Sequence, residues 1–161
     1  MAPAVSAAVP PLTLSRLGVV MTPEANNPRE CEGVLNPAVV RSQDGQLFLF
    51  PRLVSAGNYS RIGVARVEFD SHGTPTAVHR LGVALEPAAH YEKNAITGGG
   101  VEDPRIVYFE PLGRYLMTYT AYSSHGPRIA LASSTDLLTW ERLGLVRFGA
   151  GRDDFNAVNN K

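Results

Sequence analysis

The sequence contains one cysteine, Cys31, among 161 residues, so no disulfide can form within the chain. Sparse cysteine is typical of a reducing compartment, and we expect a cytoplasmic protein. The four histidines lack the spacing of metal ligands, and we expect neither a metal site nor an organic cofactor. They are His72, His79, His90 and His125.

Charge of one sign is also lacking, because 15 Lys and Arg balance 15 Asp and Glu. Without a basic stripe, the sequence does not indicate a nucleic-acid partner. No apolar run approaches the roughly 18 residues that span a bilayer, so we expect no membrane partner. Residues 1–13 are rich in Ala, Pro and Val but have no basic start. We interpret them as a loose leader rather than a signal peptide.

Long helical periodicity is missing, whereas glycine and proline are frequent, with 15 and 12 residues. Short runs rich in β-branched and aromatic residues alternate with turn residues, which is typical of an all-β fold. One short helical turn is expected near residues 135–138. The expected strands are residues 38–40, 46–53, 61–69, 76–85, 105–109, 115–122, 128–133 and 141–148.

An internal repeat relates the two halves of the chain. Asn36-Pro37 recurs as Asp103-Pro104, and Arg61-Ile62 recurs as Arg128-Ile129, both 67 positions later. Each unit contains four expected strands, as a β-propeller blade does. A closed propeller needs about four to eight blades, and this chain would supply about two and a half. We therefore expect part of a longer protein, or a chain that pairs with a partner.

The most informative segment is residues 98–106, where three glycines precede Glu102-Asp103-Pro104. Glycines allow close backbone approach, and Pro104 favours an extended conformation for Asp103. The segment predicts a carboxylate held at the start of a strand, which suits a general acid. The alternative is an Asp103 that caps backbone N–H groups. Alternation predicts that Glu102 points to the opposite face, to bind a ligand or to pair with Arg105.

Several segments together resemble glycoside hydrolase family 130, which comprises β-mannoside phosphorylases and related β-mannosidases. They are residues 98–106, 115–123, 126–134 and 136–144, with Asn36-Pro37-Ala38 and residues 50–63 in the first unit. The resemblance covers residues 14–161. It implies that these residues are the N-terminal part of a catalytic five-bladed propeller, whose five repeats would need about 335 residues.

The resemblance implies that Asp103 is the catalytic acid. It protonates the leaving oxygen through a hydroxyl of the mannosyl ring. Inorganic phosphate, the co-substrate, attacks the anomeric carbon with inversion of its configuration, which gives α-mannose 1-phosphate. One alternative is an inverting hydrolase of the same family, with a second carboxylate about 6.5–9.5 Å away as base. Another is a non-catalytic sugar-binding module. A homo-oligomer is among the expected assemblies.

The remaining site residues follow from side-chain chemistry combined with the resemblance. A guanidinium group can donate two hydrogen bonds at once to a phosphate or to two neighbouring hydroxyls. A side-chain amide both donates and accepts hydrogen bonds. We assign sugar binding to Asn36, Arg52, Asn58, Arg61, Glu102 and Tyr122, and phosphate binding to Arg128. Each has a structural alternative: Asn36 and Asn58 as turn residues, and Arg61 and Arg128 as packing residues of the repeat. At least one of Tyr119 and Tyr122 is expected in the core, together with Trp140.

Overall fold

The computed structural model describes residues 12–94 and 98–147, and it confirms the all-β prediction. The first unit is formed by β1 (Gly33–Arg41), β2 (Leu47–Ser55), β3 (Tyr59–Phe69) and β4 (Pro75–Leu85). The second unit is formed by β5 (Gly99–Phe109), β6 (Arg114–Ser123), β7 (Gly126–Ser134) and β8 (Glu141–Leu145). Two 3-10 turns, η1 (His90–Glu92) and η2 (Glu110–Leu112), interrupt the strands.

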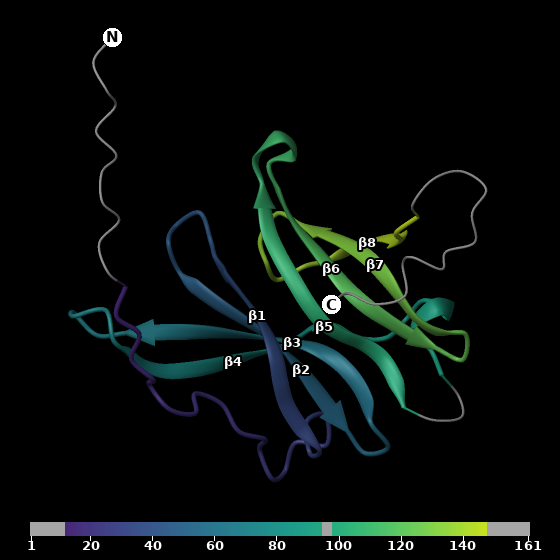
Figure 1. Ribbon diagram of the computed structural model, residues 1–161, viewed down its shortest axis with the longest axis horizontal. Coiled ribbons are helices and arrows are strands. Elements are labelled where there is room, and N and C mark those ends of the chain that lie inside the picture. The colour runs from purple at the N-terminus through teal and green to yellow at the C-terminus, as the bar shows by residue number, and fades with distance from the viewer. Residues whose placement is uncertain (1–11, 95–97, 148–161) are drawn as a thin grey trace.

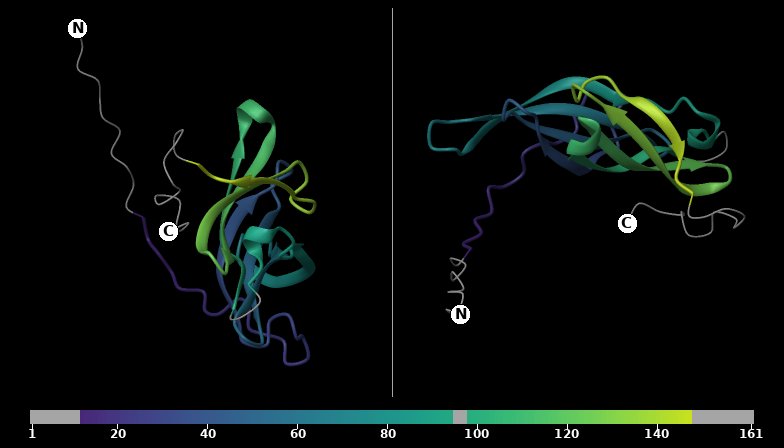
Figure 2. Two further views of the ribbon diagram at one scale, coloured as in Figure 1. Left: turned by 90° about the vertical axis from the view of Figure 1, so that its right-hand side faces the viewer. Right: turned by 90° about the horizontal axis from the view of Figure 1, so that it is seen from above.

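All eight strands belong to one sheet, and the two units lie next to each other in it (Figures 1 and 2). The strand order is β1-β2-β3-β5-β6-β7-β8, and β4 pairs with β3. Pairing within each unit is antiparallel, whereas β3 and β5 join the units through a short parallel pairing. This pairing matches Tyr59 with Gly99 and Ser60 with Gly100. The first strands of the units, β1 and β5, lie side by side near the centre of the molecule (Figure 1).

The main core fills the space between the two units. Phe50 and Ile62 of the first unit and Met117 and Tyr119 of the second are fully buried within it. Trp140 is buried there as predicted, with its ring edge-on to Phe50 at 5.8 Å between centroids. Removing these large apolar side chains from water stabilises the packing of one unit against the other.

Residues 12–32 run beside the first unit (Figure 1). Val19 and Val20 of this segment line small cavities together with residues of β4 and of β1. The fully buried Glu30 anchors this segment, because its Oε1 accepts from the backbone N–H of Glu24 at 2.8 Å. The Arg80 guanidinium of β4 lies 3.0 Å from the same oxygen. The pairing compensates the buried charge. No helix among the described residues could span a membrane.

The repeat is visible in the backbone, since Asn36 and Asp103 occupy equivalent positions in β1 and β5. Both residues are left-handed, with φ of 45° and 48°. The ladder register shifts at each, between Leu35 and Ala38 and between Glu102 and Arg105. The extended conformation predicted for Asp103 is therefore wrong. Proline has no N–H group to donate to a strand ladder, so the Asn-Pro and Asp-Pro pairs each lie in a β-bulge. Asn and Asp tolerate the positive φ that the bulge requires.

Residues 135–139 form bends rather than the expected helical turn. Leu137 is left-handed at φ 67°, which interrupts a right-handed turn. The side chain of Asp136 accepts from the backbone N–H groups of Leu138 and Thr139 at 2.9 and 2.8 Å. Short polar side chains compete with helix formation in this way.

Candidate active site

Asp103 is held where β1 and β5 meet, by one residue from each of two strands of the first unit. The Asn36 Nδ2 group of β1 donates to Asp103 Oδ1 at 2.9 Å. The Arg52 Nη1 atom of β2 lies 3.5 Å from the same oxygen. Both bulges place these side chains together, because each re-aims the residue that precedes its proline.

Asp103 belongs to a cluster of polar side chains that is centred on the guanidinium of Arg52. Its other members are Asn36, Asn58, Ser60 and Glu102. Arg52 Nη2 donates to Glu102 Oε1 at 2.8 Å and to Asn58 Oδ1 at 3.3 Å, and its Nε donates to Ser60 Oγ at 2.8 Å. A planar group that donates in several directions fixes the relative positions of its acceptors. Between 11% and 13% of the Arg52, Glu102 and Asp103 side chains is exposed. Hydrogen bonds in such a poorly solvated site are stronger than in water.

The two adjacent carboxylates converge, contrary to the alternation argument. Glu102 and Asp103 both lie beside the Arg52 guanidinium, and the predicted opposite-face placement is wrong. The bulge after Glu102 breaks the two-residue period on which that prediction depended. Of the two predicted roles of Glu102, pairing with Arg105 is replaced by an ion pair with Arg52.

The three glycines permit close approach, as predicted. A side chain on Gly100, at φ 107°, would place its Cβ 2.1 Å from Ser60 O. On Gly99, at φ 125°, it would lie 2.7 Å from Tyr122 O. Only glycine adopts such a φ without strain and leaves room for a neighbouring backbone. The parallel pairing of β5 with β3 therefore depends on Gly100, and the close approach of β6 depends on Gly99.

Three predicted site residues lie outside this hydrogen-bonded group. Arg61 follows Ser60 on β3 and so points to the opposite face, where its Nε lies 3.0 Å from Glu86 Oε2. Arg128 is half-buried on β7, and its Nη1 donates to Pro127 O at 2.8 Å. Tyr122 is half-buried on β6, opposite Gly100. Their roles in binding stay predictions.

Sequence reasoning missed two residues that shape the cluster. Ser60 is fully buried and accepts from Arg52, and its place before the Arg61-Ile62 repeat was the only available signal. Glu32 accepts from the backbone N–H groups of Gly57 and Asn58 at 3.0 and 2.9 Å. Nothing in its sequence neighbourhood indicates this contact, which joins segments 25 residues apart.

A buried group of side chains joins η1 to the second unit. Glu92 of η1 is fully buried, and its Oε1 accepts from the Tyr119 hydroxyl at 2.6 Å and from Arg142 Nε at 2.9 Å. Burial and the Glu92 carboxylate raise the pKa of Tyr119, so its hydroxyl stays a donor. Within residues 12–94 and 98–147, no three His, Cys, Asp or Glu side chains gather as a metal would require.

Residues 11–161 match the model of glycoside hydrolase family 130, which is described as β-1,4-mannooligosaccharide phosphorylase. The chain belongs to this family. A 1,2-β-oligomannan phosphorylase from Thermoanaerobacter sp. (strain X514) is 30% identical over 135 residues, which are 79% of this chain and 42% of that protein. The resemblance drawn from the sequence motifs is therefore confirmed.

Solved structures of family 130 and of a related glycosyl hydrolase agree with this assignment. A glycosyl hydrolase from Bacteroides ovatus matches with a TM-score of 0.67 and 26% identity, covering 86% of this chain and 42% of that one. A structure from work on family 130 hydrolases that target β-1,2 mannosidic linkages in Candida mannan matches with a TM-score of 0.65. It is 28% identical over 86% of this chain and 42% of its own. The chain thus spans less than half the length of these relatives.

Proposed function

We propose that the complete protein cleaves β-mannosides with inversion, by phosphorolysis to α-mannose 1-phosphate, and that Asp103 donates the proton. The observation that carries the proposal is the fixed carboxyl group of Asp103 at the junction of β1 and β5, bonded to Asn36 and beside Arg52. A positioned acid of this kind lowers the barrier to departure of the leaving sugar. The family match supports the choice of a β-mannoside as substrate.

In the proposed reaction, a phosphate oxygen attacks the anomeric carbon from the face opposite the leaving group. The bond from the anomeric carbon to the glycosidic oxygen breaks, and its electron pair stays on that oxygen. The proton of Asp103 passes to a hydroxyl of the mannosyl ring, whose own proton passes to the leaving oxygen. Phosphate is already an anionic nucleophile, so the reaction needs no second carboxylate as base.

The neighbouring residues have proposed binding roles. Asn36, Asn58 and Glu102 contact sugar hydroxyls. Arg52 binds the sugar and fixes the position of the acid relative to it. The assignments made from sequence remain for the others: Arg61 and Tyr122 bind sugar, and Arg128 binds phosphate. Tyr122 and Arg128 lie on adjacent strands of the second unit, whereas Arg61 is engaged with Glu86.

The proposed fold of the complete protein is a closed five-bladed propeller, in which β1–β4 and β5–β8 are the first two blades. The 67-residue offset between Asn36 and Asp103 supports it, because both occupy the same bulge of consecutive four-stranded units. Further blades would complete the pocket around Asp103. We also propose that the protein acts in the cytoplasm.

Hydrolysis is the second proposed reaction, because one of the similar structures comes from work on family 130 hydrolases. Water would then replace phosphate, and a carboxylate from elsewhere in the complete protein would activate it. In an inverting hydrolase, that carboxylate lies about 6.5–9.5 Å from the acid.

The test is the dependence of mannoside cleavage on phosphate in the complete protein. We expect α-mannose 1-phosphate to accumulate only when inorganic phosphate is present, and Asp103→Asn to lower kcat by about 10²–10⁴-fold. Asp44→Asn, which changes an exposed carboxylate in the β1–β2 turn, is the control and should leave kcat unchanged. Release of free mannose at a rate independent of phosphate would favour the hydrolase. Turnover near wild type in Asp103→Asn would exclude Asp103 as the acid.

A further inference from the structure

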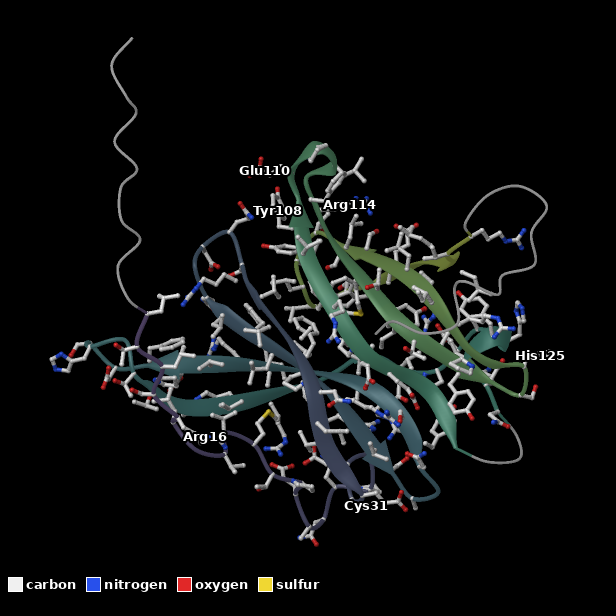
Figure 3. All side chains as sticks on the ribbon, in the orientation of Figure 1. Arg16, Cys31, Tyr108, Glu110, Arg114 and His125 are labelled. Carbon is white, nitrogen blue, oxygen red and sulfur yellow. The ribbon has the colours of Figure 1, made fainter. Side chains whose placement is uncertain are left out.

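We infer that Glu32 is a positioning residue for the acid, and that it acts through the turn between β2 and β3. The inference rests on the proposed function. Glu32 lies in the segment that leads into β1, one residue after Cys31, which Figure 3 labels at the outer edge of the first unit. Its backbone N–H donates to Val54 O at 2.9 Å, which holds the residue beside the end of β2.

The turn that Glu32 contacts has an anion-binding backbone. Gly57 and Asn58 are both left-handed, with φ of 78° and 57°. Successive backbone N–H groups in such a turn form a concavity that binds a negative group. The Glu32 carboxylate occupies it, with Oε1 3.0 Å from Gly57 N and Oε2 2.9 Å from Asn58 N. The charge-assisted pair stabilises a conformation that costs a non-glycine residue free energy.

Asn58 connects this turn both to the Arg52 guanidinium and to the start of β5. Its Oδ1 accepts from Arg52 Nη2 at 3.3 Å, and Arg52 contacts both Glu102 and Asp103. Its backbone carbonyl accepts from Gly99 N at 3.0 Å, at the start of β5. A movement of the Asn58 backbone would therefore shift the guanidinium and the strand that carries the acid together.

The close packing around Asn58 leaves little room for independent adjustment. A Cβ on Gly98 would lie 2.7 Å from Asn58 O, so the two backbones are already in contact. Glu32 itself does not belong to the group of side chains around Asp103. It is exposed, which means that its removal leaves no buried group without a partner. Its effect on the reaction should therefore be one of geometry.

The experiment compares Glu32→Ala with Glu68→Ala in the complete protein. Glu68 is an exposed carboxylate of the same unit. Its charged neighbours are His79 at 3.0 Å and Arg66 at 3.9 Å, both far from the turn in sequence. For Glu32→Ala we expect kcat to fall about tenfold, because a displacement of the acid by less than 1 Å is sufficient for such a loss. KM should change less than kcat, and Glu68→Ala should match the wild type in both.

Hydrogen exchange provides a readout that does not depend on activity. In Glu32→Ala, exchange should accelerate at the amides of Gly57 and Asn58, and also at Gly99, whose acceptor is Asn58. Faster exchange confined to Gly57 and Asn58 with an unchanged kcat would overturn the inference. If the complete protein cleaves no mannoside, the proposed function fails. The exchange at Gly99 then decides by itself whether Glu32 holds the start of β5.

Discussion

At the scale of single residues, the backbone conformation matters as much as side-chain identity. Asp103 reaches Arg52 because its φ is 48°, and Asn36 reaches Asp103 because its φ is 45°. The 67-residue repeat predicted that these two positions are equivalent, and the structure confirms it. Their mutual contact was not predictable, because strand periodicity assigns faces only while the ladder continues without a bulge.

Gly100→Ala provides a test at this scale. At φ 107°, the new Cβ would lie 2.1 Å from Ser60 O, so the pairing of β3 and β5 would have to open. We expect a loss of about 3 kcal/mol or more in the free energy of unfolding. The measurement is the shift of the urea unfolding midpoint.

Gly82→Ala is the matched control for Gly100→Ala. Gly82 has a φ of 119°, but a Cβ there has no heavy atom within 4 Å. It should therefore incur only the conformational cost of about 1–2 kcal/mol. Equal losses in the two variants would contradict a steric origin of the effect.

At the scale of elements, the short turn η1 between β4 and β5 is held by an ion pair of the buried Glu92 with Arg142. This 3-10 turn lies in the connection between the two units, and its Glu92 receives hydrogen bonds from the second unit. Arg142 Nε of β8 lies 2.9 Å from Oε1, and the Ala88 and Ala89 N–H groups lie 2.8 and 3.0 Å from Oε2.

The state of Glu92 predicts a pH dependence of stability. Burial raises the pKa of Glu92, but hydrogen bonds from Arg142, Tyr119 and the two backbone amides outweigh burial and leave the pKa below its usual 4.5. The ionised form is therefore favoured in the folded state. Its contribution is fully present above about pH 4.5 and is lost as pH falls through the lowered folded-state pKa.

Glu92→Gln tests this contribution. At pH 7 we expect a loss of about 3 kcal/mol or more, since the variant leaves the Arg142 charge without its partner. Below pH 4.5, the unfolding midpoint of the variant should fall less steeply with pH than that of the wild type. Glu141→Gln, which removes an exposed partner of Arg114, should cost less than about 1 kcal/mol. Identical acid profiles for wild type and Glu92→Gln would assign the acid sensitivity to other carboxylates.

At the scale of the whole molecule, both units of the sheet carry exposed apolar side chains. On the second unit, Val107 is 59% and Leu143 is 51% exposed, and on the first unit Val39 is 53% exposed. Apolar surface of this kind commonly marks a site of contact with another protein surface. In the proposed propeller, neighbouring blades would cover these side chains.

The 161-residue chain expressed by itself should therefore associate with itself. We expect its sedimentation coefficient to rise with protein concentration, since intermolecular contacts remove the apolar faces from water. Val107→Lys, which changes an exposed position of β5, should weaken the association without changing the fold. A chain that remains monomeric at high concentration would show that these faces need no cover.

The sequence by itself determined the strand-rich architecture, the repeat and the family, because these depend on local alternation, turn residues and a fixed offset. It also identified most of the residues around Asp103, namely Asn36, Arg52, Asn58 and Glu102. Only the tertiary structure decided which of them meet. The Arg52–Glu102 ion pair joins residues 50 positions apart, and the Glu32 contact depends on two left-handed residues in a turn. Local sequence patterns do not specify such contacts, because they arise when distant strands pack and bulges redirect their side chains.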